Sequence, residues 1–206
     1  GRRGPVRDLS LTVSPLHPIL GPATQLGFVV RDVEAAMRHW IEVFGVGPFI
    51  CMERGVSQPP AVTWMRGRPV TVELKLAFGF MGDVQIELIQ QTNDAPSPYT
   101  EFLAAGREGL QHFGFWAPDH ARATQAVEAA GYERVYEIRV AGQDLPIIYY
   151  QSPALYGPML EIVPPKWRRS REAVKAAVDG WSGAGEPVIR IDTYADFIAR
   201  AGVTFD

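Results

Sequence analysis

The string QLGFV at residues 25–29 returns as HFGFW at residues 112–116, 87 positions further along the chain. Both stretches are short and largely apolar, as β-strands are, and both have glycine and phenylalanine at matching positions. Each is followed at the same offset by an aspartate, Asp32 or Asp119, that can cap the start of a helix. An internal repeat of this kind predicts two copies of one structural unit.

The end of the unit is repeated as well, because IELI at residues 86–89 matches LEIV at residues 160–163. In both strings a single glutamate stands among aliphatic residues. Between these ends, residues 32–44 have apolar side chains at helical spacing, and Gly45 follows as a helix terminator. The pattern predicts an α+β chain of two tandem βαβββ units, over residues 22–90 and 108–165.

The rest of the chain divides into three further segments. Residues 1–21 are expected to form an N-terminal arm, and residues 91–107 a connector with a short helix that begins at Ser97-Pro98. Residues 166–206 are expected to be a C-terminal helical extension. Two amphipathic helical faces are predicted in it, over residues 174–181 and 191–201.

Composition and charge exclude several classes of protein. Lys and Arg number 20 against 23 Asp and Glu, so a net charge of −3 supplies no basic surface for a nucleic-acid backbone. No apolar run approaches the roughly 18 residues of a membrane-spanning helix. Cys51 is the one cysteine, which excludes an internal disulfide and a four-thiolate metal site. We therefore expect a cytoplasmic protein with neither a nucleic-acid nor a membrane partner.

Alternation along the two matching strands places polar groups beside glycines. Gln25 and Gly27 share one side of the first strand, and His112 and Gly114 share one side of its repeat. Each glycine leaves room beside a polar side chain.

The last strand of each unit, at residues 86–89 and 160–163, adds one carboxylate to these polar groups. Glu87 and Glu161 each point away from the aliphatic stripe of their strand. If the two units pair about a pseudo-twofold axis, the repeat brings together an amide, an imidazole and two carboxylates: Gln25, Glu87, His112 and Glu161. Such mixed nitrogen and oxygen donors suit zinc, nickel, cobalt, iron or manganese.

Four strings in this order, TQLGFVVRDVEAAMRHWIEVFGVGPF, VQIELIQ, GLQHFGFW and MLEIVPP, resemble the vicinal oxygen chelate superfamily. This superfamily includes glyoxalase I, methylmalonyl-CoA epimerase, extradiol dioxygenases and antibiotic-resistance proteins. The resemblance extends over residues 24–165. It implies the half-open curved sheet of the glyoxalase/bleomycin resistance/dioxygenase fold. It also implies four metal positions, at Gln25, Glu87, His112 and Glu161. This set is similar to that of zinc-using glyoxalase I, which favours zinc, whereas the epimerase pattern would have His first and Gln second.

The resemblance further implies an activity. It is that of a metal-dependent lyase, isomerase or epimerase that shuttles a proton next to a carbonyl or thioester, through a metal-stabilised enediolate. Glu161 would be the first base, and Glu87 would act on the opposite face of the substrate. Trp116 shares the face of His112 and is a candidate substrate-binding residue. A homodimer is expected from the superfamily, without support from any particular residue.

Two other functions stay open. One is a metal-free protein that binds or sequesters a small molecule on the same scaffold. The weaker alternative is an extradiol-type dioxygenase, which needs two histidines and a carboxylate, whereas only His112 stands at a matching position. The substrate is not identified, because the segments expected to shape the pocket, residues 54–69 and 141–158, contain no recognisable motif.

A basic cluster in the C-terminal extension is expected to be an ordinary solvated face, with contact to a coenzyme phosphate as the alternative. Its members are Lys166, Arg168, Arg169 and Arg171.

Overall fold

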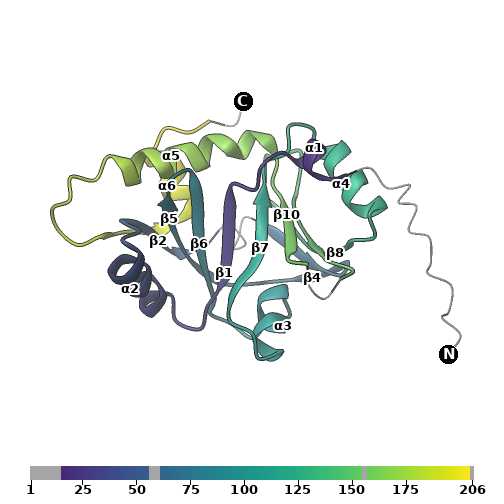
Figure 1. Cartoon of the computed structure of the whole chain (residues 1–206), viewed down its shortest axis with the longest axis horizontal. Coiled ribbons are helices and arrows are strands. Elements are labelled where there is room, and N and C mark those ends of the chain that lie inside the picture. Colours follow the sequence, from purple (N-terminus) through teal and green to yellow (C-terminus); the bar gives the residue numbers. More distant parts are fainter. Residues whose placement is uncertain (1–14, 56–60, 155–156, 205–206) are drawn as a thin grey trace, which may run out of the picture.

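The two copies of the repeat meet at their first strands, in the centre of one curved sheet (Figure 1). The computed structural model describes residues 15–55, 61–154 and 157–204. Strand β1 (Gln25–Val29) lies antiparallel to β7 (Gly109–Phe115). On its other side, each of these strands pairs in parallel with the last strand of its own unit, β6 (Val84–Gln91) or β10 (Met159–Ile162). The units are therefore related by a local twofold axis between β1 and β7.

The sheet continues outward through the middle strands of each unit. These are β5 (Leu74–Met81) and β2 (Phe49–Arg54) in the first unit, and β9 (Ile147–Gln151) and β8 (Glu133–Arg139) in the second. The full order of the 11 strands is β11-β2-β5-β6-β1-β7-β10-β9-β8-β3-β4. The prediction of an α+β fold with tandem βαβββ units in a curved, half-open sheet is thus confirmed.

One helix of each unit covers the outer face of the sheet. Helix α2 (Val33–Phe44) begins at the Asp32 cap and ends at Gly45, whose φ is 67°. Helix α4 (His120–Ala129) occupies the equivalent place in the second unit and lies at the opposite side of the molecule in Figure 1. Ile86 and Leu88 pack with α2 in the outer core. Because side chains alternate along a strand, the residue between them faces the inner side.

The inner face is covered by the connector helix and by the C-terminal extension. Helix α3 (Pro98–Ala104) begins with a capping box at Ser97, and α5 (Arg168–Asp179) follows the short helix η1 (Pro165–Trp167). Side chains of α3, α5 and α6 (Tyr194–Arg200) join the largest apolar cluster. Figure 1 shows α5 lying across one end of the strands. The predicted arm contains α1 (His17–Leu20), while residues 1–14 lie outside the described part of the chain.

The C-terminal extension differs from the prediction in one element. Residues 188–193 form strand β11 (Val188–Thr193), which pairs in parallel with the edge strand β2. Ile191 therefore belongs to the sheet and not to a helical face. β-branched residues at 188, 189 and 191 favour an extended chain, and β11 pairs with backbone groups that the edge of β2 would otherwise expose.

A second difference is a hairpin within residues 54–69, where we expected only a stretch punctuated by Pro and Gly. Strands β3 (Val62–Met65) and β4 (Arg68–Val70) are joined by Arg66 and Gly67, and β3 pairs with β8 of the other unit. Both turn residues have positive φ, 45° and 75°, as tight two-residue hairpins require. The hairpin thus links the first unit to the far edge of the second.

No helix in the described ranges is both long enough and apolar enough to cross a membrane.

Candidate metal centre

The predicted site residues lie in two neighbouring rows across the centre of the sheet. In one row, Gly27 of β1 stands between Glu87 of β6 and His112 of β7. In the other, Gly114 of β7 stands between Gln25 of β1 and Glu161 of β10. The local twofold axis exchanges the two rows, because residues 25 and 27 are equivalent to 112 and 114 in the repeat. The structure therefore brings these four polar side chains to one place on the inner face.

The two glycines make room for the side chains opposite them. A Cβ atom on Gly27 would lie 1.9 Å from Cε1 and 2.2 Å from Nε2 of His112. A Cβ atom on Gly114 would lie 2.2 Å from Oε1 of Gln25. The imidazole and the amide thus lie flat over the neighbouring strand, in space that any other residue would fill.

Four donor atoms at this place have no hydrogen-bond partner among the described residues. They are Gln25 Oε1, Glu87 Oε2, His112 Nε2 and Glu161 Oε2. His112 Nε2 lies 3.4 Å from Glu87 Oε2 and 3.6 Å from Glu161 Oε2. Ligand atoms of these three residues all lie within 4.8 Å of one another, a spacing at which one metal ion could join them. Buried polar atoms are rarely left unpaired, so this concentration indicates a missing partner.

The buried charges of the site also favour a bound cation. The His112 ring is fully buried, and both glutamates are 6% exposed. Burial opposes protonation of His112, but Glu161 and Glu87 outweigh it and raise the pKa of the imidazole to about 9. Burial also raises the pKa of Glu87. A protonated His112 supplies one positive charge against the two carboxylates, whereas a divalent cation would balance both.

Two glutamines that sequence reasoning did not single out orient the donors. Gln25 Nε2 donates to Gln85 Oε1 at 3.3 Å, which leaves Gln25 Oε1 toward the site. Gln111 Oε1 lies 3.2 Å from His112 Nδ1, and Gln111 Nε2 donates to the Pro98 carbonyl at 2.9 Å. Because an amide oxygen only accepts, Nδ1 carries a proton, and loss of the other proton of the imidazolium would leave the lone pair on Nε2, where a metal could take the place of that proton. Their positions in the sequence could have indicated this role, because Gln85 stands two residues before Glu87 and Gln111 one residue before His112.

A cavity of about 50 Å³ opens beside these side chains. Trp116, 7% exposed, lines it together with Gln25, Glu87 and Glu161. Much of the remaining wall comes from η1, α5 and α6. Of the segments expected to shape the pocket, residues 141–158 supply Ile147 to this cavity, whereas no described residue of 54–69 lines it; residues 56–60 and 155–156 lie outside the described part of the chain. The C-terminal extension takes this role because α5 packs over the inner face of the sheet.

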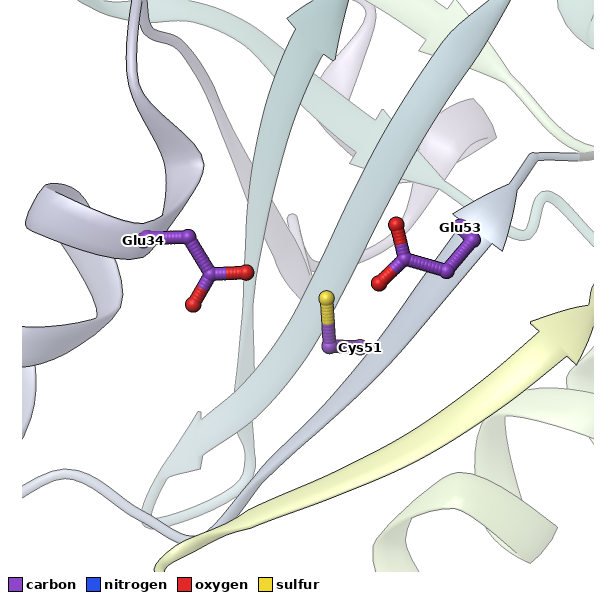
Figure 2. Close-up of side chains that lie close together, drawn as sticks. All are labelled: Glu34, Cys51 and Glu53. Atoms are coloured by element: carbon purple, nitrogen blue, oxygen red, sulfur yellow. The ribbon is translucent and has the colours of Figure 1, made fainter.

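A second cluster of possible ligands, Glu34 of α2 with Cys51 and Glu53 of β2, is shown in Figure 2, and basic side chains already neutralise it. Lys75 Nζ lies 2.9 Å from Glu34 Oε1 and 2.9 Å from Glu53 Oε2, which places an ammonium group where a metal would bind. Arg190 makes two further bonds to Glu34, and this pairing lowers the pKa of Glu34 to about 2. Burial raises the pKa of the Cys51 thiol to about 11, so it stays protonated at neutral pH. This cluster is an ion-pair network around a buried thiol.

Replacing Gly27 by alanine is expected to destabilise the protein, by about 1–3 kcal/mol, because the new methyl group overlaps the His112 ring. The ring cannot move aside easily, since Gln111 holds it and the Tyr149 ring packs against it in a T-shaped contact, with the ring centroids 5.0 Å apart. Urea unfolding in the presence of a chelator measures the effect apart from metal binding. Gly114→Ala is the matched comparison, and we expect it to be milder because the atom it meets first is the end of a flexible side chain. Equal stability of Gly27→Ala and wild type would contradict the packing described.

The comparisons with known proteins agree with this fold. A sequence model of the Glyoxalase/Bleomycin resistance protein/Dioxygenase superfamily matches residues 24–150, more than half of the chain. No match was found among curated proteins. Among solved structures, the hypothetical protein BH1468 from Bacillus halodurans C-125 is similar with a TM-score of 0.50 and 17% identity, over 68% of this chain and 91% of that one.

Two further solved structures are similar over a comparable part of the chain. A mutant of 4-hydroxymandelate synthase from Streptomyces coelicolor has a TM-score of 0.50 and 15% identity, over 69% of this chain and 38% of its own. Methylmalonyl-CoA epimerase from Mycobacterium tuberculosis has a TM-score of 0.48 and 16% identity, over 71% of this chain and 89% of its own. At these identities the two structures with a TM-score of 0.50 show a common fold alone, and the match to the superfamily model identifies the family. The chain belongs to the Glyoxalase/Bleomycin resistance protein/Dioxygenase superfamily, the vicinal oxygen chelate proteins.

Proposed function

We propose that this protein is a metal-dependent enzyme that moves a proton at a carbon next to a carbonyl or thioester, as a lyase, isomerase or epimerase. The observation that supports it is the set of four buried donor atoms without a hydrogen-bond partner, on Gln25, Glu87, His112 and Glu161. Two carboxylates, Glu87 and Glu161, line one small cavity, and proton removal and return require two such groups.

The donor set fits a divalent cation. Three oxygen donors and one imidazole nitrogen suit zinc, with nickel, cobalt, iron or manganese as alternatives. Gln111 and Gln85 would act as outer partners that hold His112 and Gln25 in position. When bound, the cation supplies positive charge that stabilises the negative charge developing on a substrate oxygen.

The residues of the chain divide the remaining work. Glu161 removes the proton from the substrate carbon, which requires one of its oxygens to be free of the metal. Glu87, its equivalent in the other unit, delivers or removes a proton on the opposite face. His112 is fully buried and does not reach the cavity, so its role is to hold the metal. Trp116 and the apolar side chains around it exclude water from the reacting carbon.

The test is hydrogen exchange in heavy water. Zinc-loaded protein is incubated with a panel of 2-oxoaldehyde thiol adducts and acyl-CoA thioesters, and loss of the proton next to the carbonyl is followed by NMR. We expect exchange with at least one compound at a rate well above that of zinc alone. Stoichiometric binding of compounds from the panel without exchange would instead indicate a sequestering protein.

The two alternatives explain the site less well. A metal-free binding protein would keep two carboxylates, Glu87 and Glu161, buried around a single imidazole, with four polar atoms lacking hydrogen bonds. A ring-cleaving dioxygenase would need a second histidine at the iron, and His112 is the one histidine of the cluster found among the described residues. Oxygen uptake with catechols by iron-loaded protein would support the dioxygenase instead.

A further inference from the structure

We propose that Arg171 and Trp116 form an anion-binding subsite beside the metal centre, so that the substrate has a carboxylate or phosphate group near its reacting carbon. The assignment of the reacting carbon rests on the proposed function above. The binding of the anion does not, because Arg171 belongs to α5, outside the residues matched to the superfamily.

Arg171 is a partly buried cation without an acidic partner. Its guanidinium lies over the Phe80 and Trp116 rings, at 5.2 and 5.6 Å from their centroids. Nη2 donates to two backbone carbonyls, those of Thr24 at 3.2 Å and Asp83. Its Nε is buried with no hydrogen-bond partner, and no carboxylate lies within ion-pair distance in the described part of the chain. A guanidinium stays charged at neutral pH, and the carboxylates of Asp83 and Glu172 act on it only through longer-range electrostatics, without bonding to it.

The second donor belongs to Trp116, whose ring the guanidinium covers. Trp116 Nε1 is also buried and has no hydrogen-bond partner among the described residues. An indole N–H can only donate, and so can a guanidinium N–H. The aromatic ring also lies under the guanidinium, which holds the cation in place. Two unpaired donors in one wall are complementary to an acceptor with negative charge.

This wall separates two cavities. Arg171 and Trp116 line the inner cavity of about 50 Å³, which contains the metal-binding side chains, and also an outer cavity of about 290 Å³. Arg168 lines the outer cavity and donates to the Trp116 carbonyl at 2.8 Å, while Glu172 is the acidic residue of that lining. With two arginines against one glutamate, the outer cavity has a positive balance. An anionic group bound by the arginines would leave the other end of the substrate for the metal centre.

The sizes of the cavities narrow the class of substrate further. The inner cavity has room for only a few ligand atoms, on the scale of a few water molecules. We therefore infer a small reacting group, such as a short 2-oxo or 2-substituted acyl unit, with the anionic group at the boundary between the cavities.

Binding of simple anions to metal-free protein tests the subsite. Isothermal titration compares succinate and inorganic phosphate with succinamide, which has the shape of succinate without the charge. The variants are Arg171→Met, Arg171→Lys and the control Arg169→Met, which removes a charge from the exposed side of the same helix. We expect one anion to bind wild type and Arg169→Met equally, and Arg171→Met at least about tenfold more weakly. Arg171→Lys should be intermediate, because it keeps the charge but loses Nε.

Several results would overturn the proposal. These are binding of neither anion, equal binding of succinate and succinamide, or equal weakening by Arg171→Met and Arg169→Met. If Arg171→Met does not fold, the affinity of Arg171→Lys and the comparison of succinate with succinamide still test the subsite. The same titrations on zinc-loaded protein detect an anion held by the metal, since that binding would not depend on Arg171. Anion binding that depends on Arg171, without proton exchange for any compound of the panel, would contradict the proposed activity and support the anion-binding subsite.

Discussion

Replacing His112 by alanine is expected to abolish stoichiometric metal binding. The imidazole is the one nitrogen donor of the cluster, and its Nε2 lies between the two carboxylates. Removal of an outer partner of a metal ligand typically weakens metal binding by about 10- to 100-fold, and loss of the ligand itself should cost more. Elemental mass spectrometry of tag-free protein after dialysis measures the metal that each variant retains.

His39→Ala is the control for this experiment, because His39 is exposed on α2 and far in sequence from the cluster. It should retain as much metal as wild type. Equal metal in His112→Ala and wild type would contradict the proposed ligand. Absence of metal from wild type, even after reloading with zinc, nickel, cobalt and iron, would favour the binding protein instead.

Replacing Glu161 by glutamine is expected to slow proton exchange by about 100-fold or more, the usual contribution of a general base. The substitution keeps the shape of the side chain and an oxygen that can still bind a metal, as Gln25 is proposed to do. What it removes is the ability to accept a proton. The rate of exchange in heavy water measures the effect, and metal content measured on the same sample separates loss of the base from loss of the ion.

Glu87→Gln and Glu42→Gln complete the comparison. If the two carboxylates act on opposite faces of the carbon, each of Glu161→Gln and Glu87→Gln should block exchange for one hand of a chiral substrate more than for the other. Glu42 is exposed on α2, and its replacement should leave the rate unchanged. Wild-type turnover by Glu161→Gln would rule out its role as the base.

Much of the fold could be predicted because the signals are local or repeated. The Asp32 cap, the apolar face of α2 and Gly45 lie within a few turns of one helix, and they specify its two ends almost unaided. The alternation in β6 separates Glu87 from Ile86 and Leu88. The repeat then relates distant segments, since equivalent strands of two equal units can pair about a twofold axis.

Other elements could not be predicted because their conformation depends on a distant partner. The segment 188–193 is short, and its apolar and polar residues do not strictly alternate. It becomes a strand because it pairs with the free edge of β2. Likewise, the hairpin at residues 62–70 is completed by pairing with β8, about 70 residues further along the chain. The basic cluster of the extension was expected to be solvated, and Arg168 and Arg169 are exposed. Arg171 instead lines both cavities, because only one side of α5 packs on the sheet.

The sequence by itself determined the two units, the strands and faces that hold Gln25, Glu87, His112 and Glu161, and the family to which their arrangement is similar. Strand periodicity and an internal repeat are properties of neighbouring residues and of their order, so they can be recognised without coordinates. Only the tertiary structure decided what surrounds these side chains. The glutamines that orient the donors, the closure of the cavity by α5 and the unpaired donors of Arg171 and Trp116 all depend on contacts between segments far apart in the chain. Such contacts are selected by packing and hydrogen bonding of the whole fold, which no local pattern specifies.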